Sequence, residues 1–571
     1  MKVLNICYGT PLLWQLAACQ NVPSAPSAED FVARREPAIT ILNDHLYITG
    51  GSFSQLVNGT IAMNGPSAAW PLKDTLSVSL KESWVNSTVQ FKVTNQTAPS
   101  FNKAAFWSDP NQPTAYLWGG WSREGKLPTT TELWQFTAND DGGGEWSRPD
   151  PANPDVLIPL LRTNGASTAT CKGKALYLGG YQSNVTDSRC RTASKLPTPG
   201  LLTYDMETRI WANVSAAPGL NRYGTSIYGA AACAENLGRN GLFFPISGQL
   251  ADVLPDFNQI NNAQFMMDTA NLTFYDVGND RWYWQQTSGD NPDTRGRHCV
   301  AGVQSSNGTY EIYVYGGNDF RDGSDDMVKS DLYVLSLPGF VWFRANTTSE
   351  PRSSHACIVN NRQMIVVGGT GAGGHGNYTE PDVWSQGLGV LDLPSLSWKH
   401  QYDADAGEYE PPQAVADWYK NGGLDSVEWH DDEVKALFVT SDNVTNDDAS
   451  SSNGPIIGGV VGGVLGVGLA LGAIRFFIRR RRRRRAAATL AMAPLPSSDR
   501  ADGGYDPPVS QNYQHYAIEL NNSSVPHHKQ RLGIGHGPYE MGVEHKPHET
   551  LLEDRPLELG TENRPQELPA R

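Results

Sequence analysis

The chain has 571 residues and a formal net charge of -15 at pH 7. This acidic balance argues against nucleic acid and against an anionic membrane surface as partners, because both are negatively charged themselves. The 57 glycines, 37 prolines and 16 tryptophans are typical of many short strands joined by turns.

Residues 1–19 have the features of a secretory signal: Lys2, then an apolar stretch, then small residues before Cys19. Beyond Cys7 and Cys19 an odd number of cysteines remains, so at least one is unpaired in a monomer. Their connectivity cannot be deduced from the sequence. These remaining cysteines are Cys171, Cys190, Cys233, Cys299 and Cys357.

Ten Asn-x-Ser/Thr tripeptides lie before residue 456, and their density there predicts an exported, glycosylated region. The predicted acceptors are Asn58, Asn86, Asn95, Asn184, Asn213, Asn271, Asn307, Asn346, Asn377 and Asn443.

One sequence motif recurs along the chain: an apolar strand that ends in two glycines and is followed by a tryptophan further on. The pairs are 52 to 69 residues apart, and Ser247-Gly248 replaces the pair in the fourth unit. Alternating aliphatic and aromatic residues predict a strand, and two glycines permit positive φ and close backbone approach. The other pairs begin at Gly50, Gly119, Gly179, Gly316 and Gly368, and the tryptophans are Trp84, Trp146, Trp211, Trp282, Trp342 and Trp398.

This pattern resembles the kelch repeat over residues 34–402. The resemblance implies an all-β fold, a six-bladed kelch-type β-propeller with four strands per blade, and we place this domain at 30–402. After it, 403–440 either adds a closing strand over 434–440, packs across the last blade, or forms a degenerate seventh blade.

Residues 456–478 are long and apolar enough to cross a bilayer as one transmembrane α-helix. Seven arginines follow at 479–485, and the positive-inside rule places them in the cytosol. We therefore expect a single-pass type I protein of the plasma membrane or another secretory-pathway membrane, with the propeller outside and a stalk at 441–455. Glycines spaced by four in this span also allow a homodimer through it.

The remaining tail, with the basic stop at its start, covers 479–571. It is rich in polar residues and proline and poor in aliphatic runs, so we expect it to be disordered. Repeats, stalk, span and basic stop together resemble a group of fungal single-pass membrane kelch proteins. That resemblance implies a cell-surface architecture more than an activity.

Four arginines stand near the start of the first strand in successive units, and two units carry a histidine three residues later. First strands of a blade lie innermost, so equivalent residues should ring one mouth of the central channel. They would bind carboxylates or acidic sugars there, or each arginine would brace a neighbouring loop. Besides Arg162, the predicted ligand-binding residues are Arg222, Arg295, His298, Arg352 and His355.

The kelch fold is shared with galactose-oxidase-like copper enzymes, which use two Tyr, two His and a Cys–Tyr thioether. His298 and His355 are the plausible histidine pair. No tyrosine with a fitting cysteine can be assigned to them, because Cys299 and Cys357 lie in the same strands. We therefore assign no catalytic residue, no metal and no cofactor, and favour a binding protein over an enzyme.

The function predicted from the sequence is a membrane-anchored extracellular binding module for a glycan or a protein. A tethered copper radical oxidase is the alternative, and a scaffold whose tail carries the function is a third hypothesis. The sequence does not identify the ligand.

Overall fold

The computed structural model describes residues 22–217, 219–220, 223–250, 266–319, 327–347, 349–371 and 378–439. The predicted signal, stalk, transmembrane segment and tail lie outside these residues, as do Arg222, Asn377 and Asn443. In the described part of the chain, no helix is both long and apolar enough to span a bilayer.

Most strands of the described chain lie in six four-stranded antiparallel arrangements, which we name sheets A to F in chain order. Sheet A contains β2 (Ala38–Leu42), β3 (His45–Thr49), β7 (Asp74–Ser79) and β9 (Lys92–Asn95). Sheet B contains β10 (Ala105–Ser108), β11 (Thr114–Trp118), β12 (Trp134–Ala138) and β13 (Gly144–Ser147). Sheet C contains β14 (Ser167–Cys171), β15 (Lys174–Leu178), β18 (Leu201–Asp205) and β19 (Ile210–Val214).

The second half of the ring repeats this order. Sheet D contains β20 (Ala230–Ala234), β21 (Leu242–Ile246), β22 (Asn271–Asp276) and β23 (Arg281–Gln286). Sheet E contains β25 (Cys299–Gln304), β26 (Tyr310–Tyr315), β27 (Leu332–Leu337) and β28 (Val341–Arg344), with β24 (Ser288–Gly289) added parallel to β28. Sheet F contains β29 (Ala356–Asn360), β30 (Gln363–Val367), β31 (Leu388–Asp392) and β32 (Ser397–Lys399).

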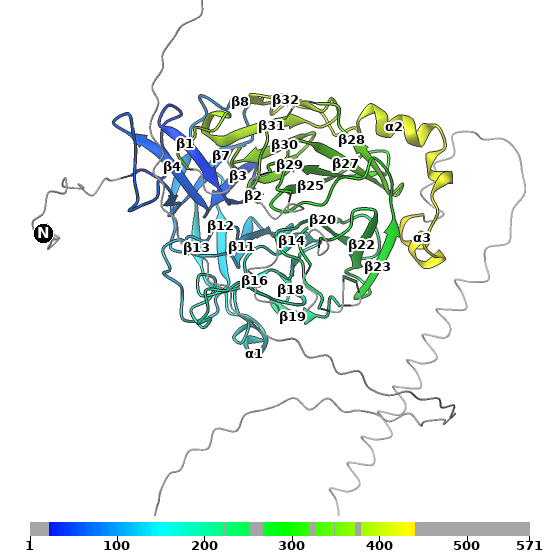
Figure 1. Ribbon diagram of the computed structural model, residues 1–571, viewed down its shortest axis with the longest axis horizontal. Helices are drawn as coiled ribbons and strands as arrows, with labels where there is room; N and C mark the ends of the chain where they lie inside the picture. The colour runs from blue at the N-terminus through cyan, green and yellow to red at the C-terminus, as the bar shows by residue number, and fades with distance from the viewer. Residues whose placement is uncertain are drawn as a thin grey trace, which may run out of the picture. The chain divides into compact units, whose positions relative to one another are not determined.

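The six sheets lie around a common centre (Figure 1). Their first strands contact one another in chain order, β2 with β10, then β14, β20, β25 and β29, and β29 contacts β2 again. Each four-stranded sheet has two apolar faces, so a closed ring is what allows every face to be buried. This arrangement is consistent with the kelch propeller that the sequence predicts.

The core is divided into clusters between neighbouring sheets, and strand β26 shows how. Ile312 and Val314 pack with residues of sheet D, whereas Tyr313 and Tyr315 pack with residues of sheet F. Successive side chains of a strand point to opposite faces, so each middle strand contributes to two interfaces. All four side chains are fully buried.

The paired glycines follow the second strand of their sheets, as the sequence pattern predicts. Gly316 shows why: its φ is +64°, and an added Cβ would lie 2.2 Å from the carbonyl oxygen of Arg352 in the next unit. Only glycine tolerates this approach. Five of the six repeat tryptophans lie on the fourth strand, at Trp146, Trp211, Trp282, Trp342 and Trp398.

Trp84 departs from this pattern and contributes to ring closure. It lies in β8 (Trp84–Val85), which pairs with β33 (Gln401–Tyr402), and its ring stacks on that of Tyr402 with centroids 5.3 Å apart. At the other end of the chain, β1 (Phe31–Arg35) pairs with β4 (Ser52–Val57), and Arg34 also bridges to Gly369 of sheet F. Segments from both ends of the described region therefore join sheet A to sheet F.

Several short strands and helices lie outside the six sheets. Strands β5 (Thr60–Ile61) and β6 (Trp70–Pro71) pair with β4, and β16 (Tyr181–Gln182) pairs with β17 (Leu196–Pro197). The short helices α1 (Pro154–Leu157) and η3 (Ser385–Gly387) lie in the connections of sheets B to C and within sheet F.

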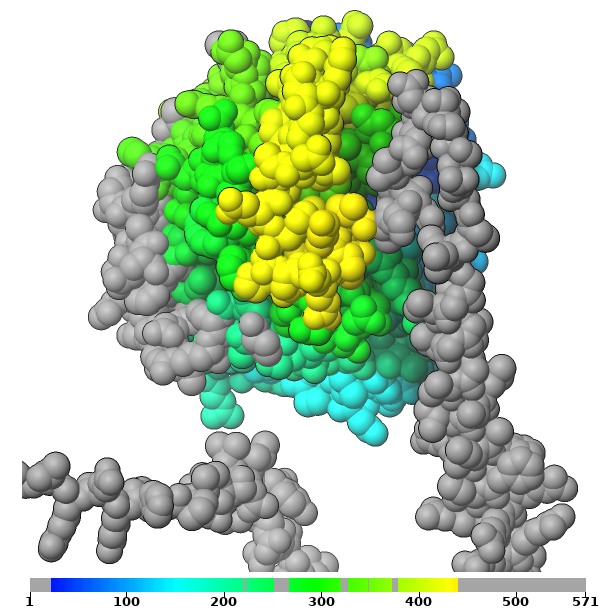
Figure 2. Space-filling view, turned by 90° about the vertical axis from the view of Figure 1, so that its right-hand side faces the viewer, coloured from blue at the N-terminus to red at the C-terminus, as the bar shows by residue number. Residues whose placement is uncertain are grey.

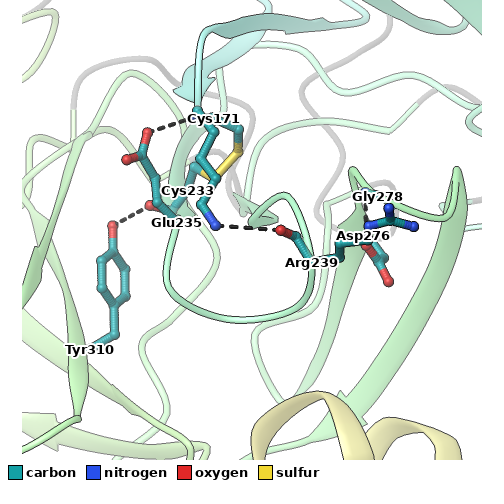
Figure 3. Close-up of a disulfide and its surroundings, with 8 residues drawn as sticks. Cys171, Cys233, Glu235, Arg239, Asp276, Gly278 and Tyr310 are labelled. Carbon is teal, nitrogen blue, oxygen red and sulfur yellow. Dashed lines mark hydrogen bonds between the residues drawn. A yellow bond between two sulfur atoms is a disulfide. The ribbon is translucent and has the colours of Figure 1, made fainter. Parts of the chain in front are cut away.

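Two disulfides join inner strands of adjacent sheets, a pairing that the sequence left open. Cys171 bonds to Cys233 between sheets C and D, and Cys299 bonds to Cys357 between sheets E and F. Figure 3 shows the first, where the Tyr310 hydroxyl of sheet E also donates to the carbonyl oxygen of Cys233 at 2.6 Å. Cys190 is free and half-buried.

Residues 403–439, which we call the strap, cross the outside of the ring (Figure 2). The strap contains α2 (Gln413–Lys420), η4 (Gly423–Ser426) and α3 (Asp432–Phe438). Val434 and Phe438 of α3 are buried against sheets D and E, and Val415 of α2 is buried between sheets E and F. The closing strand considered for 434–440 was wrong, because Asp431 caps a helix there by accepting a hydrogen bond from the backbone N–H of Val434.

A buried carboxyl group lies beneath the strap. Glu311 of β26 is fully buried and accepts a hydrogen bond from the Ser336 hydroxyl at 2.8 Å. That hydroxyl also lies 3.0 Å from the Tyr419 hydroxyl of α2. Burial raises the pKa of Glu311 to about 7, although hydrogen bonds partly oppose the shift.

The raised pKa of Glu311 makes stability depend on pH. Above about pH 4.5 the folded protein keeps a proton that the unfolded chain loses, so the free energy of unfolding should fall as pH rises to about 7, by about 3 kcal/mol in total. Glu311→Gln should remove this slope, whereas exposed Glu408→Gln should keep it. Denaturant titrations of the three proteins at pH 5 and pH 8 measure the difference, and equal slopes for all would contradict the assignment.

Candidate functional site at the mouth of the central channel

The inner strands of all six sheets line a central cavity of about 300 Å³. One end of this cavity is formed by residues that lie just before the inner strands, among them Glu36, Lys103, His298, Ser354 and His355. Polar side chains from four different units therefore meet at one mouth of the channel. The walls further in are made mainly of Ala, Thr, Val and Ile.

The backbone of this mouth repeats around the channel. In every sheet, the residue two positions before the inner strand has a φ between +52° and +76°, although only one of these residues is glycine. Positive φ is uncommon for other residue types and is characteristic of sites where surrounding contacts impose it. We call these residues the mouth ring: Glu36, Lys103, Gly165, Tyr228, Arg297 and Ser354.

Hydrogen bonds between successive members impose this conformation. The backbone N–H of Lys103 donates to the carbonyl oxygen of Glu36 at 2.8 Å, and that of Ser354 donates to Arg297 at 2.9 Å. The N–H of Glu36 in turn donates to Ser354 at 2.8 Å, which connects the first unit to the last. Two further bonds of the same kind join Tyr228 to Gly165 at 2.6 Å and Arg297 to Tyr228 at 2.7 Å.

Several positively charged side chains lie around the aromatic side chain of Tyr228. The guanidinium of Arg297 lies 4.5 Å from the ring centroid of Tyr228, and the ammonium of Lys103 lies 5.3 Å from it. Lys195 donates to the Tyr228 hydroxyl at 3.2 Å. Burial alone would raise the pKa of Tyr228, but the charges of Arg297 and Lys195 and the hydrogen bonds from Tyr181 and Lys195 outweigh it, so the pKa is lowered.

His298 and His355 lie together at this mouth, as the sequence predicts for equivalent positions of adjacent units. Both are buried, and no ring nitrogen of either makes a well-aligned hydrogen bond. Burial lowers the pKa of both well below the usual range, and nearby cations act in the same direction, whereas backbone groups of Ile246 and Tyr315 oppose the shift. Both imidazoles are therefore neutral at physiological pH, each with one donor and one acceptor nitrogen.

The predicted arginines occupy a different environment. Arg352 is buried, donates to both carboxylate oxygens of Asp382 at 2.7 and 2.9 Å and to the carbonyl oxygen of Gly368 at 2.8 Å. Arg295 repeats this pattern with Asp331 and with the carbonyl oxygen of Gly316 at 3.1 Å. This geometry favours the bracing role that the sequence left open.

Arg162 also acts within the structure, since its guanidinium donates to the carbonyl oxygens of Thr186, Thr130 and Pro128. Arg222 lies outside the described residues. Sequence reasoning missed the mouth ring, although three of its six members stand two positions after Arg34, Arg295 and Arg352. The available signal was their fixed distance from the start of each inner strand.

The predicted glycosylation sites fall into two groups. Asn86 is buried, and its side-chain nitrogen donates to the carbonyl oxygen of Leu388 at 2.9 Å, so it is not an available acceptor in the folded protein. The other predicted acceptors among the described residues are exposed: Asn58, Asn95, Asn184, Asn213, Asn271, Asn307 and Asn346.

The disulfides bear on the copper-oxidase hypothesis. Because Cys299 and Cys357 are bonded to each other, neither is available for a thioether with a tyrosine beside His298 or His355. The described residues contain no cluster of three or more His, Cys, Asp or Glu side chains suited to a metal ion.

Comparison with known proteins agrees with the repeat pattern. The family profile described as the KLHDC2/KLHL20/DRC7 Kelch-repeats domain matches residues 260–417. The described region is a kelch-repeat β-propeller. A kelch repeat-containing protein of the fungus Arthroderma benhamiae is a distant relative, 23% identical over 436 residues, which cover 70% of this chain and 61% of that protein.

Two further proteins are similar to the propeller over shorter or more divergent stretches. The kelch repeat protein M-T8 of Myxoma virus is 27% identical over 205 residues, 35% of this chain and 31% of that protein. The chain thus spans about three fifths of the fungal relative and about a third of the viral one. A solved structure titled "Structure of YjhT" is 13% identical, with a TM-score of 0.41, and the match covers 66% of this chain and 99% of that one.

Proposed function

We propose that the chain is a membrane-anchored, six-bladed kelch propeller outside a fungal cell that binds a glycan at the mouth ring. The predicted span at 456–478 supports the anchor, and the exposed sequons support export. The propeller supplies a rigid ring that holds polar side chains from several units around one cavity.

One observation carries the binding proposal: buried polar groups that make no well-aligned hydrogen bond gather at this mouth. The Ser354 hydroxyl and the ring nitrogens of His298 and His355 make no well-aligned hydrogen bond. Buried polar groups are nearly always satisfied, so such a cluster is typical of a site that a polar ligand completes. Neutral imidazoles and a hydroxyl each donate and accept, which matches the hydroxyl groups of a sugar.

The Ser354 hydroxyl can be removed without disturbing the backbone. Ser354 has a φ of +58°, so Ser354→Gly deletes the hydroxyl while it introduces the residue best suited to that conformation. We expect the variant to remain as stable as the wild type and to bind its glycan about three- to tenfold more weakly, the value of one hydrogen bond. Asn361→Gly is the matched control, because exposed Asn361 has a φ of +52° in the turn between β29 and β30.

The measurement is binding of the purified full-length protein, in detergent, to an array of neutral and acidic glycans and of peptides. Glycan binding that is weakened by Ser354→Gly and unaffected by Asn361→Gly supports the proposal. Binding confined to peptides, or glycan binding that Ser354→Gly leaves unchanged, would overturn it.

A further inference from the structure

Lys103 has a position that no other lysine of the described residues shares. It belongs to the mouth ring and precedes sheet B, yet its ammonium lies 5.3 Å from the ring centroid of Tyr228, the mouth-ring residue that precedes sheet D. Its charge also affects the pKa of both His298 and His355, which precede sheets E and F. The Lys103 side chain therefore reaches across the channel mouth and lines the cavity.

Among the described residues, no carboxylate forms an ion pair with the amine of Lys103. Within the same part of the chain it forms no hydrogen bond, and it lies over the Tyr228 ring. The charge of Glu36 acts on this amine, but the Glu36 carboxylate accepts from the Trp121 indole N–H at 2.8 Å and from the Asn102 amide at 3.3 Å. The positive charge of Arg297 also acts on the Lys103 ammonium.

We propose that Lys103 is a carbonyl-reactive amine that forms an imine with an aldehyde group of a ligand in the channel mouth, such as the open-chain form of a reducing sugar. The inference rests on the proposed function for the identity of the natural ligand. The reactivity itself depends on the local geometry of Lys103.

The reaction needs no oxidant, reductant or cofactor. The neutral amine attacks the carbonyl carbon, a C–N bond forms, and the carbonyl oxygen becomes a hydroxyl group by taking up a proton. Loss of that hydroxyl with a proton from nitrogen releases one water molecule and leaves the C=N bond. Attack requires the neutral amine, which a positively charged neighbour and burial of the amine both favour.

The electrostatics of the site support this chemistry. Burial lowers the pKa of Lys103 to about 8, Arg297 acts in the same direction, and Glu36 opposes the shift. At pH 7.5 such an amine is about two hundredfold more often neutral than an ordinary lysine. The lower basicity of the amine reduces its nucleophilicity, so a smaller advantage in rate is expected.

The test is trapping with glycolaldehyde and cyanoborohydride at pH 7.5 on the full-length protein in detergent, with site-resolved mass spectrometry. We expect the reduced adduct to form on Lys103 at least tenfold faster than on exposed Lys81. Lys103→Arg should retain the charge, and the fast-labelled peptide should disappear from the digest. No adduct on Lys103, or a rate no higher than that of Lys81, would overturn the inference.

The two proposals fail separately. Glycolaldehyde is a free small aldehyde, so trapping does not require that the protein binds a glycan. If Lys103 is labelled fast but the array shows no glycan binding, the proposed glycan-binding function is contradicted and the inference that Lys103 is reactive is still supported.

Discussion

Replacing Arg352 with alanine is expected to lower the free energy of unfolding by about 3–5 kcal/mol. Arg352 binds the carboxylate of Asp382, and the side chains of both residues are only 2% exposed. The guanidinium also lies 3.9 Å from the ring centroid of Trp384. Truncation of Arg352 would leave a buried carboxylate without its counter-ion, which costs more than the pair contributes as a whole.

Denaturant unfolding of Arg352→Ala, Asp382→Ala and the double variant tests this prediction. The double variant should lose less than the sum of the single losses, because the second change removes the charge that the first leaves unpaired. Exposed Arg344→Ala is the control and should change stability by less than about 0.5 kcal/mol. If the free energy of unfolding of Arg352→Ala falls by less than about 1 kcal/mol, the bracing role is contradicted, and Arg352 becomes a candidate ligand contact again.

Removing the disulfide between Cys299 and Cys357 should cost about 4 kcal/mol, since it closes a loop with a sequence separation of 58 residues. The bond ties the first strand of sheet E to the first strand of sheet F, beside His298 and His355. We therefore expect the Cys299→Ser, Cys357→Ser protein to unfold at a lower denaturant concentration than the wild type. Cys190→Ser, which changes the free cysteine, should leave the midpoint in place. Identical midpoints for all three proteins would show that the closed ring holds sheets E and F together unaided.

The ring of sheets could be predicted because its signals are local and repeated. Gly316 is a glycine for a steric reason that recurs at Gly50 and Gly368, and the strand before Gly316 alternates between two interfaces. Such patterns are visible in a single repeat and gain weight from their number. The histidine pair was found in the same way, from equivalent positions in adjacent units.

The mouth ring could not be predicted in this way. Its members share a backbone conformation and differ in side chain, from Glu36 and Lys103 to Tyr228 and Ser354. The conformation is imposed by hydrogen bonds between units far apart in sequence, such as Glu36 to Ser354. Arg295 and Arg352, two positions before Arg297 and Ser354, gave a clearer sequence signal, but their side chains bind Asp331 and Asp382.

The strap shows a different limit. Residues 434–438 are rich in apolar residues and could form a strand or a helix by local pattern alone. Their conformation follows from Asp431 at the helix start and from the aromatic side chains of Phe274 and Phe340 against which Phe438 packs. Neither partner is near in sequence, so tertiary packing decides between the two.

The central claim is that a glycan occupies the channel mouth, and the ring signals of His298 and His355 test it most directly. Both imidazoles lie inside the proposed site, whereas His45, His400 and His430 belong to turns, strand ends and the strap. In full-length protein labelled at histidine, NMR titration with the glycan captured on the array should shift the signals of His298 and His355 together, with one shared saturation curve. The signals of His45, His400 and His430 should stay in place. Saturable binding that shifts these three and leaves His298 and His355 unchanged would contradict the claim.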